Sequence, residues 1–220
     1  ARTAFGPWGG FVTGLAENME YVLTPAVVVF FIGAYLGAIF GTGEGFAPVW
    51  WLLGYIVFIG LNVAGVETSF RFIVVITLVA LAILAVLWIG ALPLFDWAHL
   101  LNIGVGPDGA AIELPEGGGP WLPFGLGGIV LAMPFAIWFF LAIEQLPLAA
   151  EESHQPARDL PRGLTLGIIT LIVAAFLTLF LNTGIAPGAF QLATSGEPVL
   201  DGFRTIFGDG AGATILALAA

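Results

Sequence analysis

The chain has 220 residues, of which 59% are apolar and 9% charged, and its formal net charge is -10 at pH 7. A soluble core of this size cannot bury so much apolar surface, so the composition predicts an all-α, multispanning membrane protein. The lack of lysine argues against nucleic acid as a partner, and the lack of cysteine excludes disulfides, thiolate metal sites and cysteine nucleophiles.

Five apolar segments are predicted to cross the bilayer, and a sixth begins near the end of the chain, so residues 1–220 are treated as a single transmembrane domain. Their approximate bounds are 9–40, 47–64, 72–94, 124–150 (broken), 163–185 and, for the beginning of the further span, 212–220. The chain does not open with Met and stops within an apolar run, which predicts an internal fragment of a larger protein.

Polar connections are predicted between the spans. They include a turn from Glu67 to Arg71, a loop from Phe95 to Pro123 with a short helix at Asp96 to Asn102, and a turn from Glu151 to Arg162. A Gly/Pro loop is expected after the fifth span, because Gly and Pro interrupt regular structure there.

The first span carries two acidic residues on one helix face, because Glu17 and Glu20 are three residues apart. Glu17 lies within about three turns of the predicted membrane boundary, so a solvated helix entrance accounts for it. Glu20 lies deeper, and two interpretations stay open: it lines the pathway of a solute or coupling ion, or it makes a structural hydrogen bond to another span.

The fourth span contains a carboxylate at membrane depth. Glu144 follows the aromatic run Trp138-Phe139-Phe140, with Pro134 before it and Pro147 after it. An ionisable group is costly there and proline frees backbone carbonyls, so this helix is predicted to be broken and to line a cavity. We favour a protonatable, functional Glu144 over a structural carboxylate that caps freed amides. Trp138 either packs within the aromatic run or offers its ring face to a cationic amine.

The arginines predict the orientation, because short cytoplasmic loops accumulate positive charge. If Arg2 is cytoplasmic, alternation of the spans places Arg71, Arg158 and Arg162 on the same side and leaves Arg204 outside. The outer loops are then rich in acidic residues, which favours a cationic solute.

One stretch, Ile143 to Arg162, resembles the amino acid, polyamine and organocation permease superfamily. In that family the sixth transmembrane helix ends with a carboxylate, and a Glu-Glu-x-x-x-Pro-x-x-x-x-Pro-Arg turn leads into the seventh. The positions that match this spacing are Glu151, Glu152, Pro156, Pro161 and Arg162.

The resemblance covers essentially the whole chain. The opening stretch Phe5 to Phe11 is similar to the family's entry to its third helix, and Gly14 to Ala26 looks like the ethanolamine permease branch. It implies a LeuT-like fold of inverted repeats in the cell inner membrane, of which this chain would hold helices three to seven and the beginning of helix eight.

The resemblance also implies site residues. Trp138 would close over the bound solute, Phe139 to Ala142 would form an unwound segment, and Glu144 would be the carboxylate beyond it. Ala142 stands where a glycine is usual in the family. In some members a lysine of the fifth helix stands in for a sodium ion, whereas this chain has Ala80 near that place, which leaves the coupling ion open between proton and sodium.

The predicted function is a secondary transporter, not an enzyme, that moves ethanolamine or a similar small amine by alternating access. A zwitterionic amino acid permease is the alternative within this class. A proton-conducting subunit of a membrane redox complex is the alternative from another class, although the lysine or histidine relay partners it needs are missing from the spans. No cofactor, metal or catalytic residue is predicted; the expected partners are the solute and membrane lipid, and the oligomeric state is left open.

Overall fold

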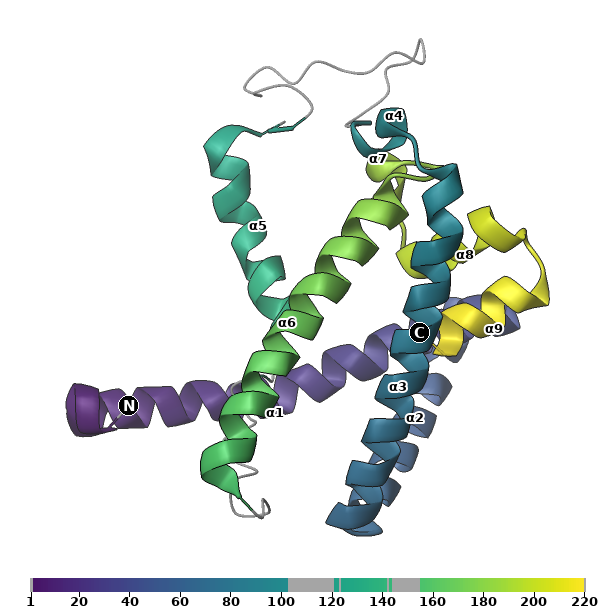
Figure 1. Ribbon diagram of the computed structural model, residues 1–220. Helices are drawn as coiled ribbons and strands as arrows, with labels where there is room; N and C mark the ends of the chain where they lie inside the picture. Colours follow the sequence, from purple (N-terminus) through teal and green to yellow (C-terminus); the bar gives the residue numbers. More distant parts are fainter. Residues whose placement is uncertain (1, 103–120, 123, 142, 144–154, 220) are drawn as a thin grey trace. The chain divides into compact units, whose positions relative to one another are not determined.

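The computed structural model describes residues 2–102, 121–122, 124–141, 143 and 155–219, and every regular element within these residues is a helix. Three of the described helices are long and apolar enough to cross a membrane: Arg2–Phe40, Arg71–Leu94 and Pro156–Thr183. The predicted all-α membrane fold is therefore confirmed for the described residues (Figure 1). They form two compact units, Ala1–Val79 with Ala217–Ala219, and Ala80–Leu216 with Ala220.

The first unit is built on two antiparallel helices, α1 (Arg2–Phe40) and α2 (Ala47–Val63), joined through the short 3-10 helix η1 (Glu44–Phe46). Two contacts of Trp50, in the first turn of α2, stabilise this connection. The Trp50 indole N–H donates to the Thr42 hydroxyl at 2.9 Å, and its ring stacks on Phe40 with centroids 5.2 Å apart. These contacts allow the chain to reverse direction within a few residues.

Small residues bring α1 and α2 into close contact. A Cβ on Gly33 would lie 2.6 Å from Cδ1 of Trp51, and a Cβ on Gly54 would lie 3.4 Å from a methyl group of Val29. Val29 is also one of the buried side chains of this unit, at 3% exposure. The two helices can approach this closely because Gly33 has no side chain, and small residues are typical of helix interfaces in membranes.

The turn predicted from Glu67 to Arg71 is wrong, because helix α3 (Val66–Ala91) already covers these residues. The chain reverses within two residues, at Ala64 and Gly65, and Gly65 has a φ of 111°, which glycine adopts without steric cost. The hydroxyl of Ser69 then donates to the carbonyl of Leu61 at 3.2 Å, so a polar residue satisfies an acceptor in the last turn of α2.

The second unit contains the C-terminal part of α3 and the remaining helices. These are η2 (Leu92–Leu94), α4 (Trp97–Leu100), α5 (Gly125–Phe139), α6 (Pro156–Thr183), α7 (Ala189–Leu192), α8 (Pro198–Phe207) and α9 (Ala211–Ala219). The short helix predicted after Phe95 is present as α4, and Asp96 caps it by accepting a hydrogen bond from the backbone N–H of Ala98 at 2.8 Å.

Two predicted connections differ from the structure. Helix α6 begins at Pro156, so the second half of the predicted turn from Glu151 to Arg162 is helical; proline at the first helical position needs no hydrogen-bond acceptor. The expected Gly/Pro loop after the fifth span contains α7 and α8, drawn in yellow-green and yellow in Figure 1. Helix α8 forms because Leu200 and Phe203 lie on one face and are fully buried.

Helices α3, α6 and α8 share the core of the second unit. Ala91, Leu181 and Ile185 are buried together, and Trp88 and Ile206 pack against them. A Cβ on Gly90 would lie 2.7 Å from a methyl carbon of Ile206, so α8 lies directly on α3. The Trp88 indole N–H donates to the Thr178 hydroxyl of α6 at 3.0 Å, which joins two helices that are distant in sequence.

Candidate functional site

Helix α5 ends inside an apolar run. Its last residue is Phe139, and the two following backbone N–H groups donate to carbonyls three residues back: Phe140 to Ile137 at 3.1 Å and Leu141 to Trp138 at 3.2 Å. Such bonds tighten the final turn and end the α-helical pattern. The α-helical pattern therefore ends where the side chains are still those of a membrane span.

A proline weakens the same helix one turn earlier. Pro134 lies inside α5 and has no N–H to donate to the carbonyl of Val130. Together with the end at Phe139, this leaves carbonyl acceptors on a helix whose sequence from Gly125 to Phe139 offers no polar side chain other than the indole of Trp138. Within a membrane such groups need a polar partner, a neighbouring helix, water or a ligand.

The aromatic residues at this end do not all face one space. Trp138 and Phe139 are 42% and 46% exposed, and the rings of Phe139 and Phe140 meet edge to face with centroids 5.8 Å apart. A shallow hollow of about 320 Å³ lies beside them, lined by Ala136, Ile137, Phe140 and Leu141. Trp138 is not among the residues that line this hollow.

The chemistry available at the end of α5 suits a cation. The C-terminal end of a helix carries a partial negative charge, and the face of a tryptophan ring attracts ammonium groups. Of the predicted site residues, Trp138 and Phe139 lie at this end, whereas Ala142 and Glu144 lie outside the described residues.

The two acidic residues of the first span lie in the first unit, on the middle part of α1. Glu17 is exposed and Glu20 is partly buried, and Pro25 follows one turn further along the same helix. The structure thus describes Glu17 and Glu20 in one unit and Trp138 and Phe139 in the other. In the described part of the chain, no group of three His, Asp or Glu side chains is placed to hold a metal ion.

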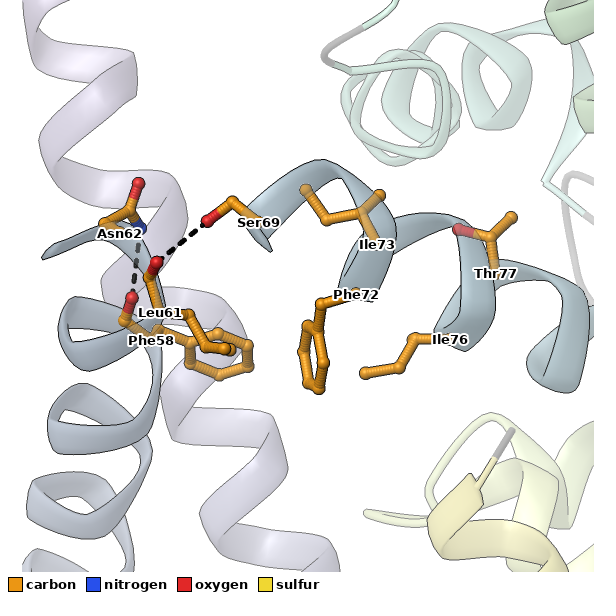
Figure 2. A pocket seen from close by; sticks show the side chains of 8 residues that line it. All are labelled: Phe58, Leu61, Asn62, Ser69, Phe72, Ile73, Ile76 and Thr77. Carbon is orange, nitrogen blue, oxygen red and sulfur yellow. Dashed lines mark hydrogen bonds between the residues drawn. The ribbon is translucent and has the colours of Figure 1, made fainter. Parts of the chain in front are cut away.

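A pocket between the end of α2 and the beginning of α3 was not predicted from the sequence (Figure 2). It has a volume of about 160 Å³, and it is lined by Phe58, Leu61, Asn62, Ser69, Phe72, Ile73, Ile76 and Thr77.

The polar groups of this pocket serve the two helix ends. Asn62 donates to the carbonyl of Phe58 at 3.0 Å and Ser69 donates to that of Leu61 at 3.2 Å, as the dashed lines of Figure 2 show. A polar residue on each side of a glycine, Asn62 before Gly65 and Ser69 after it, was the signal in the sequence. Because both side chains bond to backbone carbonyls at the end of α2, the pocket marks a helix corner and not a solute site.

Comparison with known proteins decides the family. The family model described as amino acid permease matches residues 1–217. The chain belongs to the amino acid permease family. This family of permeases, together with the long apolar helices, makes the chain a multi-pass inner-membrane protein and not an enzyme.

Individual relatives agree with this assignment. The chain is 32% identical over 209 residues to the uncharacterized transporter R00093 of Rhizobium meliloti (strain 1021), covering 93% of this chain and 42% of that protein. It is 24% identical to the uncharacterized amino acid permease YtnA of Bacillus subtilis (strain 168), covering 94% of this chain and 43% of the relative. The D-serine/D-alanine/glycine transporter of Escherichia coli (strain K12) is 25% identical over 193 residues, which cover 85% of this chain and 39% of that transporter.

The chain spans less than half the length of these relatives. No solved structure matches it.

Proposed function

We propose that this chain forms part of a secondary active transporter that moves a small amino acid across the inner membrane by alternating access. The observation that carries the proposal is the end of α5 at Phe139, inside an apolar run, in a chain of the amino acid permease family. Transporters hold solutes at broken helices near the middle of the bilayer, where half-helix ends supply partial charges.

The proposed solute contacts follow from the chemistry of that helix end. The ammonium group of the solute lies near the C-terminal carbonyls of α5 and against the ring of Trp138, with Phe139 to Ala142 as the unwound segment. Glu144 is the protonatable group beyond the break, and it responds to the charge of the solute or of the broken helix. Its structural alternative is a carboxylate that caps freed backbone amides.

The two carboxylates of α1 have a separate proposed role. Glu17 and Glu20 line the pathway of the solute or of the coupling ion, which is a proton or sodium. The spacing of three residues supports this role, because it places both carboxylates on one face of α1.

An amino acid is the first candidate solute, because the relatives with a named substrate class are called amino acid transporters. Ethanolamine is the second. The stretch from Gly14 to Ala26 supports it through its resemblance to the ethanolamine permease branch, as do the acidic residues of the predicted outer loops. Both solutes carry an ammonium group that can bind at the C-terminal end of α5. Only the amino acid also carries a carboxylate.

Uptake by cells that express the complete protein tests the proposal. Labelled alanine and labelled ethanolamine are offered separately, with unlabelled glycine, D-serine, γ-aminobutyrate and ethanolamine as competitors, and cells without the protein as the control. Uptake of alanine that is blocked by glycine or D-serine supports an amino acid permease. Uptake of ethanolamine alone supports the amine carrier, and the absence of both uptakes contradicts the proposal.

A further inference from the structure

Helix α6 has one lengthwise face that packs within its unit. Ala174 and Leu181 are buried on it, at 7% and 6% exposure, and Thr178 accepts the hydrogen bond of Trp88. A Cβ on Gly167 would lie 3.9 Å from a side-chain carbon of Ile143, so the packed face extends toward the N-terminal half of the helix.

The opposite face of α6 carries two arginines followed by an exposed apolar row. Its residues are Arg158, Arg162, Leu166, Ile169 and Val173, at spacings of four, four, three and four, which keep them on one side of a helix. The apolar members are 65%, 53% and 47% exposed, in that order. These five residues are called the α6 outer face below.

The two arginines are exposed and make no ion pair with any residue in the described part of the chain. The neighbouring carboxylate does not pair with them. Asp159 and Arg162 have the same spacing as Asp201 and Arg204 of α8, yet only the α8 pair is in contact, at 3.5 Å. Asp159 lies in the first turn of α6, where a carboxylate is stabilised by the helix dipole.

The length of α6 places the arginines at the membrane surface. The apolar run from Gly163 to Thr183 is about 31 Å long at helical rise, close to the hydrocarbon thickness of roughly 30 Å. Arg162 therefore lies at the edge of the hydrocarbon, and Arg158 lies about 6 Å further out, among the headgroups. The orientation predicted from the arginines makes this the cytoplasmic leaflet.

We propose that the α6 outer face binds an anionic phospholipid of the cytoplasmic leaflet. The lipid phosphate lies between the guanidinium groups of Arg158 and Arg162, which present planar sets of donors that suit phosphate oxygens. The acyl chain runs along Leu166, Ile169 and Val173, as the continuous apolar row below the arginines allows. Charge complementarity and the change from basic to apolar at the bilayer boundary favour this occupant.

The test uses the complete protein, purified in detergent, with phosphatidylglycerol or phosphatidylcholine added in increasing amounts. Lipid retention is read by native mass spectrometry, and stability is read as the unfolding temperature. We expect phosphatidylglycerol to be retained and to raise the unfolding temperature, with a smaller effect of phosphatidylcholine. Inorganic phosphate has no acyl chain and is expected to leave the unfolding temperature unchanged.

The double variant R158Q/R162Q is expected to lower the apparent affinity for phosphatidylglycerol roughly 10- to 30-fold, since each basic residue near an anionic surface contributes about fivefold. If the double variant cannot be purified, R158Q and R162Q are measured singly, each with about a fivefold loss expected. The matched control is R204Q, which removes the arginine that already pairs with Asp201 and should leave lipid binding unchanged.

Several results would overturn the proposal. These are wild-type affinity for phosphatidylglycerol in the arginine variants, an equal loss in R204Q, an equal response to inorganic phosphate, or no preference for the anionic lipid. The last result would indicate that another part of the protein covers the α6 outer face. None of these measurements depends on transport, so the outcome is separate from that of the proposed function.

Discussion

The amide oxygen of Asn182 in α6 occupies the space that a Cβ on Gly202 of α8 would need. Asn182 is only 4% exposed, and its amide N–H donates to the carbonyl of Pro198 at 2.9 Å. Because this bond fixes which end of the amide faces Pro198, the oxygen must face Gly202. The pair therefore joins the last turn of α6 to α8.

Gly202→Ala is expected to lower the free energy of unfolding by about 1–3 kcal/mol, because the added methyl group forces the Asn182 amide out of position. Thermal unfolding of the purified protein measures the change. Gly60→Ala in the interior of α2 is the matched control, since nothing lies within 4 Å of its Cβ position. It should be neutral or slightly stabilising, as alanine favours a helix more than glycine does.

A double-mutant cycle separates this clash from other effects. In the background of Asn182→Ala, which removes the amide, the cost of Gly202→Ala should fall because the methyl group has room. An unchanged cost would show that another neighbour, such as Leu87, opposes the methyl group.

The close approach of α1 and α2 gives a second prediction. Gly33→Ala should destabilise the first unit by about 1–3 kcal/mol, because the new Cβ would lie 2.6 Å and 2.7 Å from two atoms of the Trp51 ring. Gly37→Ala, one turn along the same helix face, is the control, since its nearest neighbour is the Thr42 hydroxyl at an ordinary 3.6 Å. Tryptophan fluorescence during thermal unfolding measures both, and equal losses would refute the proposed contact.

The hydrogen bond between Trp88 and Thr178 gives a third prediction. Thr178→Val keeps the side-chain shape but leaves the indole N–H of Trp88 without its acceptor. The free energy of unfolding should therefore fall by about 0.6 kcal/mol, the average for hydrogen bonds between membrane helices, and by no more than about 1.7 kcal/mol, the largest value found for them. Thr178→Ser keeps the hydroxyl and should lose less. The unfolding temperatures of the two variants distinguish the loss of the hydrogen bond from a loss of packing. If the serine variant is as unstable as the valine variant, the effect comes from packing.

Trp138→Ala tests the proposed solute contact. If the ring binds an ammonium group, the KM for uptake should rise about 2- to 30-fold with little change in folding. Trp138→Phe keeps an aromatic face and should lose less affinity. Trp121→Ala, which removes an indole that is 67% exposed, is the control and should keep its wild-type KM. A loss of expression with normal uptake by the remaining protein would assign Trp138 to packing.

Glu144→Gln tests the predicted protonatable group. The substitution keeps the size and removes the titration, so transport should lose part of its dependence on pH if Glu144 exchanges a proton during the cycle. Initial uptake rates across a range of pH values, at equal protein level in the membrane, measure this. A pH profile identical to that of the unchanged protein would count against a titrating role.

Much of the helical layout could be predicted because membrane spans are long and apolar, so the composition of a segment such as Pro156–Thr183 is sufficient to recognise it. The beginning of a helix carries weaker signals. Polar residues after Val66 and after Pro156 suggested turns, although the glycine at position 65 and the proline at position 156 already marked where helices begin.

Helix α8 could not be recognised by length or overall hydropathy, because it has only ten residues and an amphipathic pattern. Its signals were present in the spacing of Leu200 and Phe203, with Pro198 before them and Gly208 after them. The contact between Asn182 and Gly202 has no comparable local signal. It joins residues of different helices, and only the arrangement of those helices in space reveals it.

The bond from Trp88 to Thr178 spans 90 positions of the chain. At the usual speed of translation, roughly 5–20 residues per second, the indole is synthesised about 5–18 s before its hydroxyl partner exists. During that interval the membrane-inserted α3 must satisfy its Trp88 N–H with lipid headgroup, water or an insertion factor. The contact of α3 with α6 can thus form only after Thr178 has been synthesised, and a nascent chain stopped before Thr178 would display the indole without its final partner.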